Sequence, residues 1–433
     1  MERRNDYGIN TQFERDTLRI GEIILGDGER QLVTATRGPG GRIVKSIGLP
    51  RPEMGVGAVI YAQRQHPGYL PANGAVYTRA AYPELREAIG TVPDGIGTWS
   101  ARTPAADLQW NSVAWSPALG LFCAVAANGT NNGVMTSPDG ITWTARTPTA
   151  NNAWRDVVWA PELGLFCAVA SSGTGNRVMT SPDGINWTAR NGSTESAWFA
   201  ITWSPARRLF CAVAASGTTS RLMTSPDGIN WTASTAGLAN EWRDVAWSPE
   251  LGLFCAVAST GTGNRVMTSP DGVNWTARAS AADNEWRGIV WAPALGLFCA
   301  VASTGTNRVM TSPDGVNWTA LLSAAENQWR CIEWSPELGL FCAVASTGTG
   351  NGVMTSPDGL NWLVRTPAAN NQWFGIAWSP ALGRFCAVAS TGTGNGVMTC
   401  SPAATYNAAT QFKLPDLPAA ISGHARPFIY AGR

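Results

Sequence analysis

Short apolar runs recur along the middle of this chain, and each ends at a Gly, Pro, Asn or Asp. In the unit that begins at Trp154 the runs are WRDVVWAPELG, LFCAVASSGTG, NRVMTSPDG and INWTARNG. Runs of β-branched, aromatic and small apolar residues followed by turn residues are typical of a strand and the turn after it. The pattern therefore predicts four strands per unit, which we call a, b, c and d in chain order.

The units repeat with a regular period. Seven cysteines occupy the same place in an FCAVA run, at intervals of 44 residues with one interval of 43. They are Cys123, Cys167, Cys211, Cys255, Cys299, Cys342 and Cys386. A period of this length with four short strands is typical of one propeller blade and leaves no room for an ordinary helix. We expect an all-β, seven-bladed propeller in which the cysteines are small buried residues.

The number of strands predicts how the ring closes. Strands a, b and c occur seven times, but only six d strands follow a c strand. The seventh lies at the other end of the region, in GIGTWSARTP at 95–104. We therefore expect the last blade to combine strands a, b and c from 373–400 with strand d from 97–104. The 21 tryptophans then divide three to a blade, which predicts a packing role for them.

Composition limits the possible partners. The 31 basic residues nearly balance the 30 acidic ones, and no basic run could follow a phosphate backbone, so we expect no nucleic acid. No apolar run of about 18 residues and no signal-peptide pattern occurs, so we expect neither membrane insertion nor export. No Cys or His spacing is typical of a metal site, and we expect no metal and no cofactor.

The repeated SPDGxxW segment resembles the Asp-box of sialidase-like propellers. In that family it is a structural turn between strands c and d, and Pro, Asp and Gly are suited to a tight turn. We therefore predict structural roles for Asp139, Asp183, Asp227, Asp271, Asp314 and Asp358. Sialidases use a Tyr nucleophile, but no Tyr lies between Tyr82 and Tyr406 and no His between His66 and His424. We expect no catalytic residues and no enzyme. A glycosidase carboxylate pair has no distinct candidate in the sequence.

The two ends of the chain have a different character. Residues 56–91 resemble the phage tail-collar domain, whose pattern includes a PxGYL segment, an NG pair, an Arg, YPxL and IG. The matching residues are Pro67, Gly68, Tyr69, Leu70, Asn73, Gly74, Arg79, Tyr82, Pro83, Leu85, Ile89 and Gly90. The family continues with an FxLPDL segment, and TQFKLPDL stands at 410–417. One departure is Ala72, where the family frequently has Cys.

This resemblance implies that the propeller is inserted into the collar domain. We predict an N-terminal attachment or connector segment at 1–54, the first part of the collar at 55–92, the propeller at 93–402 and the second part of the collar at 403–433. Strand d starts at the face that carries the SPDG turns, so the chain should enter and leave the ring side by side on that face. The collar would lie beneath it, and the b–c and d–a loops would face away.

These distal loops carry Asn, Thr, Gly and Arg beside the Trp that begins strand a. Amide and guanidinium donors next to an aromatic ring suit sugar binding, whereas the alternative is that Trp packs between blades and Asn satisfies the loop backbone. The candidate receptor-binding residues are Trp154, Arg155, Asn176, Arg177, Trp242, Arg243, Asn264, Arg265, Trp286 and Arg287.

Taken with the collar resemblance, these features predict a phage tail-fibre or tail-tip protein. We expect it to sit in the virion, to be made in the host cytoplasm, to bind other tail or baseplate proteins, and to adsorb to a host surface receptor, most simply a glycan. The resemblance also implies a homotrimer. Two alternatives stay open: a structural part of the tail tip without a receptor, and a glycan depolymerase.

Overall fold

The computed structural model describes residues 96–217, 220–234 and 239–401 in full. Outside them it gives the backbone of five strands before the propeller and two after it. These are β1 (Thr17–Ile24), β2 (Arg30–Thr36), β3 (Val59–Ala62), β4 (Tyr69–Pro71), β5 (Val76–Thr78), β34 (Gln411–Lys413) and β35 (Arg426–Tyr430). The chain divides into two units, Gly95–Ala403 and a second unit made of Met1–Asp94 with Ala404–Arg433.

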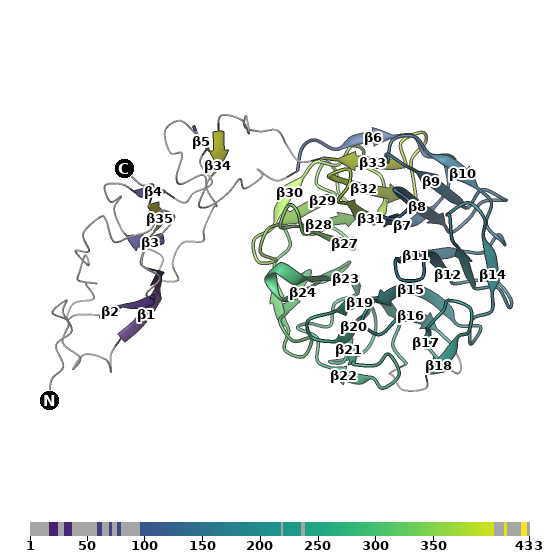
Figure 1. The fold of residues 1–433 in the computed structure, drawn as a ribbon, viewed down its shortest axis with the longest axis horizontal. Helices are drawn as coiled ribbons and strands as arrows, with labels where there is room; N and C mark the ends of the chain where they lie inside the picture. Colours follow the sequence, from purple (N-terminus) through teal and green to yellow (C-terminus); the bar gives the residue numbers. More distant parts are fainter. Residues whose placement is uncertain are drawn as a thin grey trace. The chain divides into compact units, whose positions relative to one another are not determined.

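The first unit is a seven-bladed β-propeller, as the sequence predicted. Each blade is a four-stranded antiparallel sheet, and Figure 1 shows the a strands around the centre of the ring and the d strands at its rim. The a strands are β7 (Trp110–Ser116), β11 (Trp154–Ala160), β15 (Ala197–Ser204), β19 (Trp242–Ser248), β23 (Trp286–Ala292), β27 (Trp329–Ser335) and β31 (Trp373–Ser379). The b strands are β8 (Leu121–Ala126), β12 (Leu165–Ala170), β16 (Leu209–Ser216), β20 (Leu253–Ala258), β24 (Leu297–Ala302), β28 (Leu340–Ala345) and β32 (Arg384–Ala389).

The outer two strands of each blade are shorter. The c strands are β9 (Val134–Ser137), β13 (Val178–Ser181), β17 (Leu222–Ser225), β21 (Val266–Ser269), β25 (Val309–Ser312), β29 (Val353–Ser356) and β33 (Val397–Cys400). The d strands are β10 (Thr144–Arg146), β14 (Thr188–Arg190), β18 (Thr232–Ser234), β22 (Thr276–Arg278), β26 (Thr319–Leu321), β30 (Leu363–Arg365) and β6 (Ser100–Arg102). One turn, Pro293–Leu295, forms a short 3-10 helix (η3). We number the blades 1 to 7 from β7 to β31.

The seventh blade closes the ring with a strand from each end of the propeller. β33 pairs antiparallel with β6, and Thr399 lies opposite Ser100. The amide of Gly97 donates a hydrogen bond of 2.8 Å to the carbonyl of Ser401. The predicted closure is therefore confirmed, and the chain enters and leaves the ring at adjacent positions.

The core repeats from blade to blade. The first Trp of each a strand is completely buried, as is the Phe of each b strand. In blade 3 that Phe, Phe210, lies 4.5 Å from the ring of Trp203 and 6.1 Å from that of Trp231, measured between centroids. The FCAVA cysteines are all buried, and burial raises the pKa of thiols such as Cys211 far above its usual range. They pack as small apolar residues.

Strands on either side of the propeller pair with one another in the second unit. β35 lies between β3 and β4 in a three-stranded sheet, and β34 pairs with β5. The segment before the propeller and the segment after it therefore share sheets. Apart from these strand backbones, the collar-like residues and the N-terminal segment lie outside the described residues.

Candidate functional site

The b–c and d–a loops lie together at one end of the blades, which we call the loop face. In blade 2 the Nδ2 of Asn152 donates to the carbonyl of Asn176 at 2.8 Å, joining the two loops. Arg177 donates from Nε to the carbonyl of Gly173 and from Nη1 to that of Ser196, both at 2.8 Å. The predicted receptor-binding residues Asn176 and Arg177 thus hold the loops in place.

Blade 4 repeats this arrangement. Asn240 donates to the carbonyl of Asn264 at 2.9 Å, and Arg265 donates from Nε to the carbonyl of Gly261 at 2.7 Å. The arginine side chains of both blades are largely buried, at 15% exposure for Arg265. These side chains form hydrogen bonds within the loops, so Asn264 and Arg265 also hold the loops in place.

The predicted role of the strand a tryptophans in sugar stacking is wrong. Trp154, Trp242 and Trp286 have no exposed surface, so no ring face is open to a ligand. The indole of Trp154 donates to the carbonyl of Ala150 at 3.1 Å, and that of Trp286 to the carbonyl of Ala282 at 3.0 Å. The packing alternative holds, because these side chains fill the space between neighbouring blades.

A β-bulge directly after each of these tryptophans redirects the next side chain. In every blade the pairing of strands a and b shifts register between this Trp and the second residue after it, for example between Trp154 and Asp156. A bulge leaves one residue outside the ladder and re-aims its side chain. We call the seven bulge residues the axial ring. They are Asn111, Arg155, Phe199, Arg243, Arg287, Arg330 and Phe374.

Neighbouring members of the axial ring contact one another across blades. The guanidinium carbon of Arg155 lies 4.9 Å from the ring centroid of Phe199, and that of Arg243 lies 4.5 Å from the same ring. The guanidinium carbon of Arg330 lies 5.1 Å from the centroid of Phe374. These are cation–π distances. The side chains therefore converge at the loop-face end of the innermost strands.

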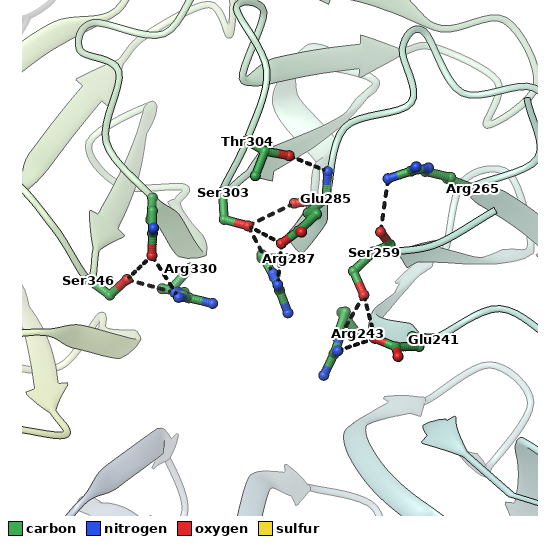
Figure 2. Close-up of polar contacts among 11 residues, drawn as sticks. Glu241, Arg243, Ser259, Arg265, Glu285, Arg287, Ser303, Thr304, Arg330 and Ser346 are labelled. Carbon is green, nitrogen blue, oxygen red and sulfur yellow. Dashed lines mark hydrogen bonds and ion pairs between the residues drawn. The ribbon is translucent and has the colours of Figure 1, made fainter. Parts of the chain in front are cut away.

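Each axial arginine is held by a serine. The Nε atoms of Arg155, Arg243 and Arg330 donate at 2.8 Å to Ser171, Ser259 and Ser346, and that of Arg287 donates to Ser303 at 3.0 Å. Figure 2 shows three of these pairs side by side on adjacent blades. Since the serine fixes Nε, the orientation of the guanidinium plane is fixed as well.

The charges of the ring are only partly balanced. Arg243 and Arg287 donate from Nη2 to Glu241 and Glu285, whereas Arg330 donates to the neutral amide of Gln328 at 3.0 Å. Burial and then the charge of Arg287 lower the pKa of Arg330 to about 10, and the same two causes lower that of Arg243. The arginines stay charged at neutral pH and repel one another.

Carboxylates follow immediately along the same strands. Asp156 accepts hydrogen bonds from the Oγ of Ser112 at 2.6 Å and from the amide of Ile201 at 2.9 Å. Asp244 accepts from the amide of Ile289 at 2.8 Å. Burial raises the pKa of both, and for Asp244 the neighbouring Asp156 adds to the rise. These two carboxylates connect blades through backbone amides rather than presenting a reactive pair.

Glu333 lies two residues further along its strand than Cys331 and has fewer partners. Its Oε1 accepts from the amide of Trp334 at 3.1 Å, and burial raises its pKa to about 7. No group of three or more His, Cys, Asp or Glu side chains in the fully described residues could hold a metal ion.

The six predicted turn aspartates all make the same hydrogen bonds at the opposite end of the blades, which we call the Asp-box face. In blade 2, Asp183 accepts from the amides of Ile185 and Asn186 at 2.8 and 2.7 Å, and the Oγ of Ser181 accepts from the amide of Gly184 at 2.8 Å. Burial alone would raise the pKa of Asp183, but these hydrogen bonds outweigh it and lower the pKa to about 2. The carboxylates therefore act as hydrogen-bond acceptors for the backbone of the turn.

Sequence reasoning named three of the four axial arginines and missed Arg330, Phe199, Phe374 and Asn111. It looked for amide and guanidinium donors beside the first Trp of strand a, and did not compare blades at the next position, which changes among Asn, Arg and Phe while that Trp never changes. This contrast within otherwise repeated strands was the signal that could have identified the ring.

A scan against models of protein families found no match to this chain, and a search of curated proteins found none either. Solved structures do resemble it. YCF48 from Cyanidioschyzon merolae aligns with a TM-score of 0.53 and 15% identity, over 71% of this chain and 99% of that one. A chain in the crystal structure of a mitotic checkpoint complex aligns with a TM-score of 0.51 and 16% identity, over 72% and 92%. At these identities the likeness establishes the propeller fold alone. In the described residues no helix is long and apolar enough to span a bilayer.

Proposed function

We propose that this chain is a phage tail-fibre or tail-tip protein that mediates adsorption, and that the loop face of its propeller binds a surface glycan of the host cell. The phage assignment is supported by the collar-like pattern at 56–91 and 410–417. Strand pairing between β5 and β34, on either side of the propeller, fits a domain that the propeller interrupts. The chain would act in the virion, as a homotrimer bound to other tail or baseplate proteins.

The observation that carries the binding surface is the axial ring. Its arginines and phenylalanines meet at the loop face, and they differ between blades whose packing residues are nearly identical. Guanidinium groups donate in a fixed fork to oxygen atoms, and aromatic rings offer an apolar surface to the C–H face of a sugar. Residues that the fold needs are the same in every blade, whereas the axial position holds Arg in four blades, Phe in two and Asn in one.

A structural spacer is the second candidate, and one observation favours it. The tryptophans of strand a are buried, and Asn176, Arg177, Asn264 and Arg265 are engaged inside the loops. The blade-repeated part of the loop face therefore offers few free recognition groups, and without the axial ring the propeller would only hold parts of a tail apart.

Retention on immobilised envelope polysaccharides from a panel of bacteria tests the proposal. Retention of the full chain without released oligosaccharide supports adsorption, and released oligosaccharide supports the depolymerase. No retention on any polysaccharide supports the spacer. The double variant Arg155→Ala/Phe199→Ala should lose retention, while Ile185→Ala, at an exposed position on the Asp-box face, serves as the matched control.

A further inference from the structure

We propose that the axial ring is a single binding site on the propeller axis for one anionic group, a carboxylate or a phosphate, carried by an acidic glycan. The glycan part rests on the proposed function, whereas the anion part rests on the ring alone. The site takes one ligand per propeller, because its members come from different blades and no blade holds a copy of it.

The ring carries an excess of positive charge. Four arginines face two acidic partners, Glu241 and Glu285, which leaves a formal charge of 4 − 2 = +2. Two positions before Arg155 stands Ala153, where the other three arginines have Glu or Gln, and among the described residues Arg330 donates only to Ser346 and to the neutral side-chain oxygen of Gln328. Within the part of the chain that the structure describes, none of the four arginines donates a hydrogen bond from Nη1. An anion would therefore find free donors and relieve the repulsion among Arg243, Arg287 and Arg330.

The donors are already in place before a ligand arrives. Each Nε is held by a serine, and the side chains of Arg243 and Arg287 are only 15% and 18% exposed, so their stems are packed and their ends are oriented. Ordering a long side chain on binding lowers affinity, and here that ordering has been done by folding. Fixed guanidinium forks select planar carboxylate or tetrahedral phosphate oxygens over neutral hydroxyls.

The ring also places an aromatic side chain among its donors. Phe199 lies within cation–π distance of both Arg155 and Arg243, so the two guanidinium groups lie against its ring. On the inner side, the carboxylates of Asp156 and Asp244 are engaged with amides of the next blade, which places the anion-binding donors at the loop face and not deeper along the strands.

Titration of the full chain with three sugars that differ only at one carbon tests the site: glucuronate, glucose 6-phosphate and glucose. We expect one of the two anions to bind with one ligand per chain, glucose not to bind, and added salt to weaken binding. Arg243→Gln should reduce the affinity about tenfold or more, since it removes charged hydrogen bonds. Arg278→Gln is the matched control: the same change in the same blade, but on strand β22, where Arg278 contacts Thr268.

The identity of the bound anion decides between a carboxylate and a phosphate source. Equal binding by Arg243→Gln and the native chain, binding of neither anion, or a stoichiometry near seven would overturn the axial site. If the chain is retained on envelope polysaccharide but binds neither anion, adsorption stands and this site falls. If an anion binds at the ring but no polysaccharide retains the chain, the site stands and adsorption falls.

Discussion

The indole Nε1 of Trp203 donates a hydrogen bond of 2.6 Å to Oε2 of Glu162, which lies in the a–b turn of the preceding blade. The same pair recurs as Trp291 with Glu250 at 2.5 Å and as Trp378 with Glu337 at 2.6 Å. In the other four blades the preceding turn has Ala in place of Glu, and the buried indole nitrogen has no partner in the described structure. Those tryptophans are Trp115, Trp159, Trp247 and Trp334.

Ala118→Glu should therefore stabilise the propeller. Ala118 is exposed and precedes Trp159 as Glu162 precedes Trp203, so the new carboxylate would accept from an indole that is now unpaired. A charged hydrogen bond of this kind contributes about 1 kcal/mol or more. Thermal and denaturant midpoints measure the gain, and Ala118→Ser, too short to reach, is the control. A midpoint that does not rise would show that Glu in this turn does not stabilise the propeller.

Trp154→Ala should lower stability and not act on binding alone. Its side chain is completely buried between blades, and removing a buried Trp costs about 3–5 kcal/mol. The measurement is the thermal midpoint beside retention on polysaccharide at a temperature where the variant is folded. Selective loss of retention with an unchanged midpoint would contradict the packing role.

Asp183→Ala should destabilise the propeller by about 1–3 kcal/mol, because the amides of Ile185 and Asn186 lose their acceptor. The pKa of Asp183, lowered to about 2, means that the folded state favours the charged form. Its stabilisation is present above the ordinary pKa of about 4 and is lost as the pH falls toward 2. A midpoint that is unchanged from pH 5 to pH 2 would contradict this account.

The buried carboxyl of Glu333 should give the opposite pH dependence of stability, and Glu333→Gln should remove it. Burial raises the pKa of Glu333 from 4.5 to about 7, so the folded state favours the protonated form. The native chain should lose stability as the pH rises from about 5 to 7, on the order of 2–3 kcal/mol. The variant should be the more stable at pH 8, with a difference that shrinks at pH 5. Glu326→Gln, at an exposed position, should show no such trend.

The architecture could be predicted because its signals are periodic. The 44-residue spacing of the cysteines predicted the blades, and the unmatched d strand at Ser100–Arg102 predicted the closure. Side-chain direction in strand a could not be predicted in the same way. Simple alternation would put Trp154 and Asp156 on one face, but the bulge between them changes the alternation. The sequence therefore left open whether the tryptophans stack on a sugar or pack between blades, and it could not show that Arg155 and its equivalents turn toward the axis.

The bulge also separates the buried positions that must stay the same in every blade from the axial position, which can vary. Replacing residues 198–241 by a copy of 242–285, as recombination between repeats would do, exchanges one 44-residue blade for another. The buried Trp, Phe and Cys positions are the same in both, so the ring should fold unchanged, while Phe199 becomes Arg. A gene built this way can change the residues of the axial ring by moving whole blades, without a new point mutation.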